Sequence, residues 1–165
     1  MFVLGIDPGL TTTGYGILET TRGGVRAVVA GVIRTDRHQP IAQRLLELHR
    51  DLTAIVDEYA PTEAAIEEVF VNRNLQTATS VGRASGVALL TLAQKGLRPA
   101  EYTPSAVKMA LTGFGGADKH QVGAVVAMRL NLPGPPRPAD AADALAIALC
   151  HIQALPFQRH VERAG

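Results

Sequence analysis

The chain has 165 residues, a mass of 17.4 kDa and a hydrophobic content of 47%, which suits one globular domain with a sizeable core. Its formal net charge of +1 offers no general excess of basic residues, so any attraction to nucleic acid has to come from a local patch. The single cysteine excludes an internal disulfide, and no signal-peptide pattern or long apolar run is present. We therefore expect a cytoplasmic protein with no membrane-spanning helix.

The amino-terminal part of the chain predicts strands joined by turns. Residues 1–6 are almost wholly apolar and predict a buried strand. Pro8 and Gly9 are a turn signal, and the apolar run that resumes at 15–18 predicts a hairpin partner. The β-branched run at 26–35 predicts a third strand. Asp7 thus stands at the first corner of a hairpin, where a carboxylate must be hydrated, hydrogen-bonded or bound to a cation.

The middle of the chain predicts helices on either side of a strand. In residues 39–61, apolar side chains recur at spacings of three and four, which indicates a helix that Pro61 ends. The apolar run at 63–71 predicts a fourth strand, although it contains glutamates. Residues 72–96 predict a long helix with a glycine at its C-cap.

The carboxyl-terminal part predicts a short strand and three helices. Residues 99–104 predict a fifth strand, and 105–116 predict a short helix stopped by glycines. A capping box led by Asp118 opens the helix expected at 119–131. After a proline-rich connector, the last helix is expected at 139–155.

This order of elements predicts an α/β fold with a mixed five-stranded sheet flanked by helices. Strands linked by hairpins pair antiparallel, whereas strands separated by helices favour parallel pairing. We expect a single domain over residues 1–155 and a polar, flexible tail at 156–165.

Four acidic residues stand out because their neighbours are apolar. Asp140 and Asp143 are three residues apart, so they share one face of the last helix. If the first and fourth strands are adjacent and this helix begins over them, the four carboxylates converge. They would then repel one another unless divalent cations neutralise them. Two such ions about 4 Å apart can support an in-line phosphoryl displacement. The four residues are Asp7, Glu67, Asp140 and Asp143.

Each of these acids also has a simpler interpretation. Asp7 could cap the Pro-Gly turn, and Asp140 could favour the positive end of its helix, worth about 0.3–1 kcal/mol. Strand alternation turns one of Glu67 and Glu68 outward, but the pattern does not say which. His151 lies about 16 Å along the helix from Asp140, so it is expected to be a packed or surface histidine.

Six motifs together resemble the RuvC family of Holliday junction resolvases, over residues 2–151. Each motif is weak alone, but their order and spacing are specific. They are "GIDPGLTTTGYGI", "AIEEVFVNRN", "GRASGVAL", "YTPSAVK", "DKHQV" and "DAADALAIALCH".

The resemblance implies a ribonuclease-H-like fold and a metal-dependent endonuclease that acts as a homodimer. Such an enzyme resolves four-way DNA junctions in recombination and repair by paired symmetric nicks that leave 5′-phosphate and 3′-hydroxyl ends. The implied cofactor is Mg²⁺, with Mn²⁺ as a substitute and two ions per active site. The family's catalytic and metal-binding carboxylates fall on Asp7, Glu67, Asp140 and Asp143, which selects Glu67 over Glu68 by analogy.

The resemblance also implies residues that contact DNA. The family's aromatic residue falls on Phe70, where stacking on a base is worth about 1–3 kcal/mol; alone it would read as a core residue. The functional lysines fall on Lys108 and Lys119, two of only three lysines in the chain, and Lys119 would stabilise the phosphate in the transition state. Arg73 and Arg83 are expected to bind backbone phosphates.

A homodimer matches the approximate two-fold symmetry of a four-way junction. The helix at 75–96 mixes small and apolar residues and is a candidate interface, although it could instead pack wholly within one subunit. The family's usual partner is the RuvA–RuvB branch-migration complex.

Two rival functions are open. "GIDPGLTTTGYG" also resembles the first phosphate motif of actin-like ATPases and sugar kinases, but those proteins use two such domains in a longer chain. A non-catalytic junction-binding protein is the other alternative. It is disfavoured because four carboxylates near DNA would weaken binding unless metal lies among them.

Overall fold

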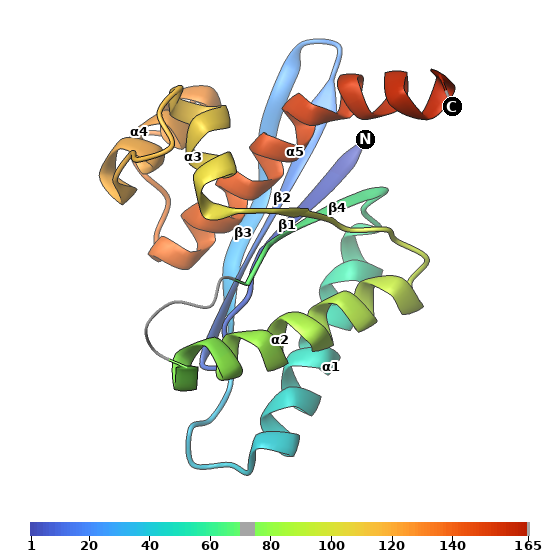
Figure 1. The fold of residues 1–165 in the computed structure, drawn as a ribbon, viewed down its shortest axis with the longest axis vertical. Coiled ribbons are helices and arrows are strands. Elements are labelled where there is room, and N and C mark those ends of the chain that lie inside the picture. Colours follow the sequence, from blue (N-terminus) through green and yellow to red (C-terminus); the bar gives the residue numbers. More distant parts are fainter. Residues whose placement is uncertain (70–74, 165) are drawn as a thin grey trace.

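The computed structural model describes residues 1–69 and 75–164, with side chains described up to Leu155. A five-stranded sheet lies between two layers of helices (Figure 1). The elements are β1 (Phe2–Asp7), β2 (Thr12–Thr21), β3 (Gly24–Arg34), α1 (Ile41–Tyr59), β4 (Glu63–Glu67), α2 (Leu75–Gln94), β5 (Ala100–Tyr102), α3 (Pro104–Thr112), α4 (Lys119–Arg129) and α5 (Ala139–Ala164).

The sheet is mixed, and its strand order is β3-β2-β1-β4-β5. The first three strands pair antiparallel as a meander, whereas β1 pairs with β4 and β4 with β5 in parallel. The strands β1 and β4 are adjacent, which is the condition that the convergence of the four acids required. Because parallel neighbours run in the same direction, β1 and β4 end at the same edge of the sheet.

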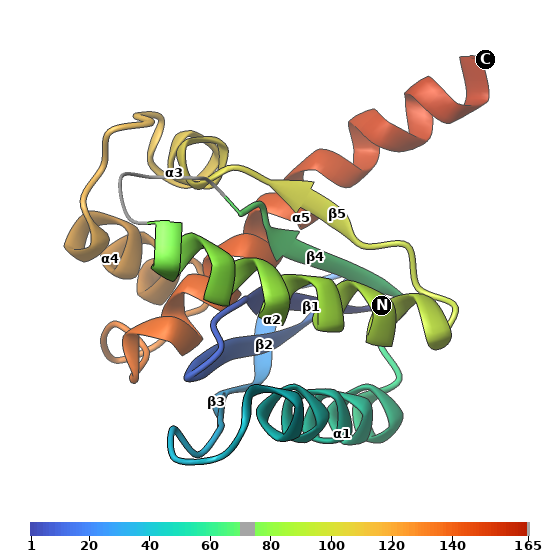
Figure 2. The same ribbon diagram turned by 60° about the horizontal axis from the view of Figure 1, so that its bottom comes forward.

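Both faces of the central strands are buried, and alternate residues enter different cores. Val3 of β1 and Ala65 of β4 pack in the core beneath α3, α4 and α5. Leu4 and Ile66 belong to the second core, beneath α1 and α2. Figure 2 shows the same division, with α1 and α2 apart from α5 across the sheet. Polar residues that follow the first set therefore emerge toward α5.

Helix α5 lies against β1 and β2 at close range because glycines remove side chains from its path. A Cβ atom added at Gly5 would lie 2.0 Å from the carbonyl oxygen of Ala144, and one at Gly14 would lie 2.0 Å from that of Asp140. The two glycines thus allow the helix backbone to rest directly on the sheet.

The element boundaries differ from expectation where pairing ends. The fourth strand was expected at 63–71 but stops at Glu67, where its neighbours β1 and β5 end at Asp7 and Tyr102; one more backbone hydrogen bond, from Glu68 N to Tyr102 O at 2.8 Å, follows. The fifth strand is correspondingly short, at Ala100–Tyr102. The segment 70–74 lies outside the described residues.

Helix α5 also differs from expectation, since it continues to Ala164 rather than ending at residue 155. Pro156 removes one backbone donor, yet the residues after it include good helix formers such as Gln158 and Glu162. The helix that was expected to stop there is therefore longer. Among the described residues, no helix is long and apolar enough to cross a membrane.

Candidate metal centre and nucleic-acid interface

The acidic residues of β1 and β4 meet because each is the last residue of its strand. Asp7 ends β1 and Glu67 ends the parallel neighbour β4. Asp7 follows Val3 and Gly5 in alternation, and Glu67 follows Ala65, so both emerge on the face that α5 covers. Glu68, one residue later, is exposed. The alternation thus selects Glu67, a choice that the sequence pattern left open.

The other two acids come from the start of α5. Asp140 and Asp143 are on adjacent positions of one helix face, and the contact of Gly14 with the Asp140 carbonyl oxygen brings this helix start over the end of β1. Oxygen atoms of Asp7, Asp140 and Asp143 lie within 4.8 Å of one another. Glu67 is not one of these three but lines the same pocket as Asp7 and Asp143. We call these four residues the acidic cluster.

The acidic cluster holds more negative charge than its surroundings neutralise. Burial, followed by repulsion from Glu67, Asp143 and Asp140, raises the pKa of Asp7 from its ordinary value of 3.8 to about 8. Burial and the charge of Asp143 also raise the pKa of Glu67. Carboxylates that resist ionisation in this way are stabilised by a cation placed among them.

Lys119 is the cation that the chain itself supplies to the cluster. It is the first residue of α4, whose start is fixed by a capping box between Asp118 and Gln121. The Lys119 Nζ atom donates to Asp143 Oδ2 at 2.8 Å, and this contact raises the pKa of the lysine. The Lys119 side chain is 74% exposed, so it remains accessible to an incoming phosphate.

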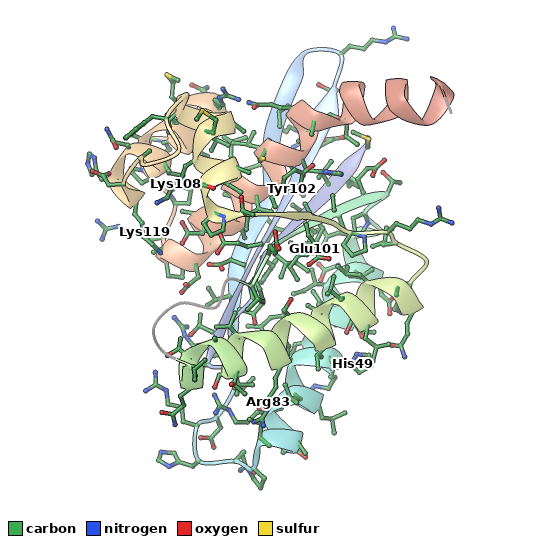
Figure 3. All side chains as sticks on the ribbon, in the orientation of Figure 1. His49, Arg83, Glu101, Tyr102, Lys108 and Lys119 are labelled. Atoms are coloured by element: carbon green, nitrogen blue, oxygen red, sulfur yellow. The ribbon has the colours of Figure 1, made fainter. Side chains whose placement is uncertain are left out.

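A pocket of about 210 Å³ opens beside the cluster. Lys108 from α3 and Lys119 from α4 both line it, together with Asp7, Glu67 and Asp143. Figure 3 shows the two labelled lysines on the same side of the molecule, near α3 and α4. A phosphate in this pocket would therefore meet positive charge from two helices as it approaches the carboxylates.

The donor set fits a hard divalent cation. All four side chains of the acidic cluster offer oxygen ligands, which Mg²⁺ and Mn²⁺ prefer. The raised pKa values of Asp7 and Glu67 indicate that the described residues around the cluster do not neutralise it.

Other residues singled out from the sequence lie elsewhere. His151 is buried on α5, where its Nδ1 atom is 2.9 Å from the Tyr102 hydroxyl; of the packed and surface positions expected for it, the packed one is observed. Arg83 lies on α2, apart from Lys108 and Lys119 (Figure 3). Phe70 and Arg73 lie outside the described residues.

Sequence reasoning missed a second cleft on the other side of Asp140. This cleft of about 530 Å³ is lined by the turn after β1, the start of α2, and two arginines, Arg37 and Arg44. Arg44 lies in the first turn of α1, where an arginine normally reads as a solvated helix residue. The sequence offers one sign that Arg44 is available to a ligand: the first turn of α1 contains no acidic residue that could pair with this arginine.

Comparisons with known proteins find similar sequences and structures over nearly the whole chain. A family model described as "Crossover junction endodeoxyribonuclease RuvC" matches residues 3–151. A protein of that name from Roseiflexus sp. (strain RS-1) is 49% identical over 159 residues, covering 96% of this chain and 95% of the relative.

Two solved structures have the same fold. A structure of Thermus thermophilus RuvC superposes with a TM-score of 0.88 at 34% identity, covering 96% of this chain and 97% of the other. A second structure, T. thermophilus RuvC in complex with Holliday junction substrate, gives a TM-score of 0.86 at 32% identity and covers 95% and 96%. The ribonuclease-H-like fold expected from the resemblance is confirmed.

Proposed function

The chain belongs to the RuvC family of crossover junction endodeoxyribonucleases, which resolve Holliday junctions, and we propose that its acidic cluster is the centre that cleaves the DNA strand. One observation carries this proposal: Asp7, Asp140 and Asp143 bring their oxygens within 4.8 Å of one another, beside a lysine-lined pocket. Without a metal ion the carboxylates repel one another, and this repulsion adds to the effect of burial in raising the pKa of Asp7.

The cluster is proposed to hold two Mg²⁺ ions, with Mn²⁺ as a substitute. Asp7, Asp140 and Asp143 are close enough to share one ion, and Glu67 completes the ligand set from the neighbouring strand. Divalent ions in such a site acidify water and stabilise the leaving oxygen of a phosphodiester. The products would then carry 5′-phosphate and 3′-hydroxyl ends.

Lys119 has two roles in this proposal. In the described structure it holds Asp143 through a 2.8 Å hydrogen bond, which fixes the carboxylate on the pocket side of α5. When a phosphate enters the pocket, the exposed ammonium can turn toward the negative charge that develops in the transition state. Lys108, which lines the same pocket from α3, adds positive charge and positions the strand.

We propose a homodimer that uses the outer face of α2. The inner face of this helix is buried within the subunit through residues such as Ala84, Ala88 and Leu92. On the outer face, Leu90 is 56% exposed, and a Cβ atom at Gly82 or Gly86 would meet nothing within 4 Å. A flat face of this composition permits close approach of a second copy, and two sites on one two-fold axis can nick matching strands.

Other implications of the family stay predictions. They are a cytoplasmic location, cooperation with a RuvA–RuvB complex, and the DNA contacts of Phe70, Arg73 and Arg83. No observation on the described part of the chain favours the nucleotide-binding or non-catalytic alternatives.

The test is strand nicking of a mobile four-way junction by the purified protein with Mg²⁺, with Mn²⁺ and with chelator. Paired symmetric nicks are expected only with metal. The variant Asp7→Asn is expected to abolish nicking while junction binding persists. Binding without cleavage under either ion would instead indicate the non-catalytic alternative. Failure to bind or cut would overturn the proposed function.

A further inference from the structure

The second cleft, beside Asp140, has the chemistry of an anion site. Its volume is about 530 Å³, and its lining is dominated by groups that can donate hydrogen bonds. They come from three separate parts of the chain: the turn after β1, the segment before α1 with its first turn, and the first turns of α2. The donors are Thr11, Thr12, Arg37, Arg44, Gln76, Thr77 and Ser80.

Arg44 is the most constrained of these donors. Its Nε atom donates to Thr35 Oγ1 at 2.9 Å and its Nη2 atom donates to Thr11 Oγ1 at 3.1 Å. These contacts fix the guanidinium against the turn after β1, but they use only part of its five donors and do not neutralise its charge. Among the described residues, no carboxylate lies within 4.0 Å of this guanidinium. A half-buried arginine held by neutral hydroxyls is prepared to receive an anion.

Arg37 adds a second cation at the rim. It is exposed, it lies in the segment that joins β3 to α1, and it lines the same cleft. Two arginines and a set of hydroxyls match a phosphate group, which has several acceptor oxygens and accepts bidentate contacts. The one acid in the lining is Asp140, which belongs to the acidic cluster.

The location of the cleft relates it to the strand that is cut. Asp140 lines the second cleft, whereas Asp7 and Asp143 line the pocket that contains the two lysines. Oxygen atoms of these three acids lie within 4.8 Å of one another. The acidic cluster therefore lies between two cationic pockets, one with Lys108 and Lys119 and one with Arg37 and Arg44. A polyanion that crosses the cluster gains positive charge before and after it.

We propose that the second cleft binds a backbone phosphate of the cleaved strand, next to the scissile phosphate, with Arg44 as its anchor and Arg37 at its rim. This inference rests on the proposed function, because it takes the acidic cluster as the cleavage point. The cleft holds one side of the strand while the lysines hold the other, so the scissile bond is drawn across the carboxylates. Arg37 and Arg44 are positioning residues in this arrangement.

A purely structural role for Arg44 makes a different prediction. If the arginine only ties Thr11 to Thr35, then Arg44→Ala lowers stability without any link to a particular phosphate. Arg37 has no hydrogen bond within the described structure that would give it such a role, so Arg37→Ala tests the cleft without that complication. Arg22→Ala is the matched control, because Arg22 is exposed in the β2–β3 turn, at the far end of the sheet from the start of α5 (Figure 1).

The experiment measures junction binding in an Asp7→Asn background, where no cleavage interferes. Four-way junctions carry one neutral methylphosphonate at successive positions around the scissile phosphate, on the cleaved strand and on the strand opposite it. The affinity of each junction is measured for the Asp7→Asn protein and for its Arg37→Ala, Arg44→Ala and Arg22→Ala derivatives. The melting temperature of each protein is recorded to detect a loss of stability. A second series without methylphosphonate measures the dissociation constant against salt.

At one position beside the scissile phosphate on the cleaved strand, the methylphosphonate is expected to weaken binding by about tenfold in the parent. This loss should disappear in Arg37→Ala and Arg44→Ala but persist in Arg22→Ala. Arg37→Ala should also reduce the slope of log affinity against log salt by about one.

The inference would be overturned if the affinity losses caused by the methylphosphonate and by the arginine substitutions were additive at every position. It would also be overturned if the two effects were coupled only on the strand opposite the cleaved one. Wild-type protein that nicks no junction would refute the proposed function, whereas the coupling would still decide whether the cleft holds a phosphate.

Discussion

Two clusters of polar side chains connect β4 to α5, and they differ in how far their own groups balance one another's charge. The acidic cluster joins the last residue of β4, Glu67, to the start of α5. A second group, which we call the histidine cluster, joins the first residue of β4, Glu63, to His151, about two helical turns beyond Asp143. Tyr102 of β5 is its third member (Figure 3).

The histidine cluster brings together groups of different kinds, a hydroxyl, an imidazole and a carboxylate. The Tyr102 hydroxyl lies 2.9 Å from His151 Nδ1, and the ring's Nε2 atom faces Glu63 at 3.5 Å. If the hydroxyl donates to Nδ1, the ring proton is on Nε2 and points to the carboxylate. Burial lowers the pKa of His151, so the ring is neutral in the fold. One ring nitrogen of His151 is thus hydrogen-bonded, and the other faces a carboxylate of opposite polarity without a hydrogen bond.

The acidic cluster is not complementary within itself. It gathers acceptors of one sign, and Lys119, the one cation bonded to it among the described residues, has a side chain that is 74% exposed. Burial and mutual repulsion hold the pKa of Asp7 at about 8. The comparison teaches that burial of a polar cluster does not by itself indicate function. What marks the acidic cluster is charge left for a ligand to neutralise.

The sharpest test of this contrast is a pair of neighbouring glutamates. Glu67→Gln removes a ligand from the acidic cluster and should reduce nicking by about 10²–10³-fold, the loss typical when one group that stabilises the transition state is removed. Glu68→Gln changes an exposed side chain one residue away and should alter the rate by less than a few fold. Equal losses from the two substitutions, measured as single-turnover nicking rates, would refute the assignment by strand alternation.

The cation of the acidic cluster is tested next. Lys119→Met removes the hydrogen bond to Asp143 and the positive charge, and should slow nicking by about 10²-fold at saturating junction. The control is Lys95→Met, since Lys95 pairs with Asp57 on the surface between α1 and α2. If the Lys119→Met enzyme had normal turnover and only weaker junction binding, Lys119 would be a phosphate contact without a role in the transition state.

The position of the cluster depends on Gly14. In Gly14→Ala the new methyl group would meet the Asp140 carbonyl oxygen, so the start of α5 has to move away from β1. We expect a stability loss of about 1–3 kcal/mol, together with weaker metal binding. Gly134→Ala adds the same methyl group where nothing lies within 4 Å and should leave both unchanged. Chemical denaturation with and without Mg²⁺ measures the two effects.

The two clusters should also make opposite contributions to how the stability of the fold changes with pH. Asp7 has a raised pKa, so the metal-free fold binds a proton that the unfolded chain has lost, and stability should fall as pH rises from about 4 to about 8. Asp7→Asn should flatten this slope and raise the melting temperature of the metal-free protein at pH 8. A slope that survives in Asp7→Asn would place the responsible group elsewhere.

The smallest effect on catalysis is expected from the histidine cluster. His151→Gln breaks a buried hydrogen bond and should cost about 1–3 kcal/mol of stability while leaving nicking within a few fold. Because the pKa of His151 is lowered, the wild-type fold should lose stability as pH falls below its ordinary value of 6.5. The variant should lose less over the same range. A large fall in turnover at equal stability would connect this cluster to the active centre.

The sequence predicted the parts of the site that local patterns encode. Asp7 follows an apolar run directly, and Asp140 and Asp143 share a helix face by spacing alone. The order of elements allowed the strand adjacency that brings these residues together but did not establish it. The capping box at Asp118, which fixes the helix that carries Lys119, was also visible as a motif.

The remaining parts depend on contacts that leave no local trace. Glu67 could not be separated from Glu68 by pattern because β4 is buried on both faces, so its apolar residues do not alternate with polar ones. The close approach of Gly14 to α5 depends on residues far apart in the chain. The cleft of Arg37 and Arg44 likewise forms from three separate segments, and the segment that carries the two arginines contains no recognisable motif.

The central claim is that the acidic cluster is completed by a divalent cation, and proton release on metal binding tests it most directly. At pH 7 the Asp7 carboxyl, with a pKa of about 8, is mostly protonated and must lose its proton to bind metal. Titration calorimetry with Mg²⁺ or Mn²⁺, in buffers of different ionisation enthalpy, should report release of about one proton by the wild-type protein and far less by Asp7→Asn. Metal binding without proton release, or equal release by both proteins, would contradict the account.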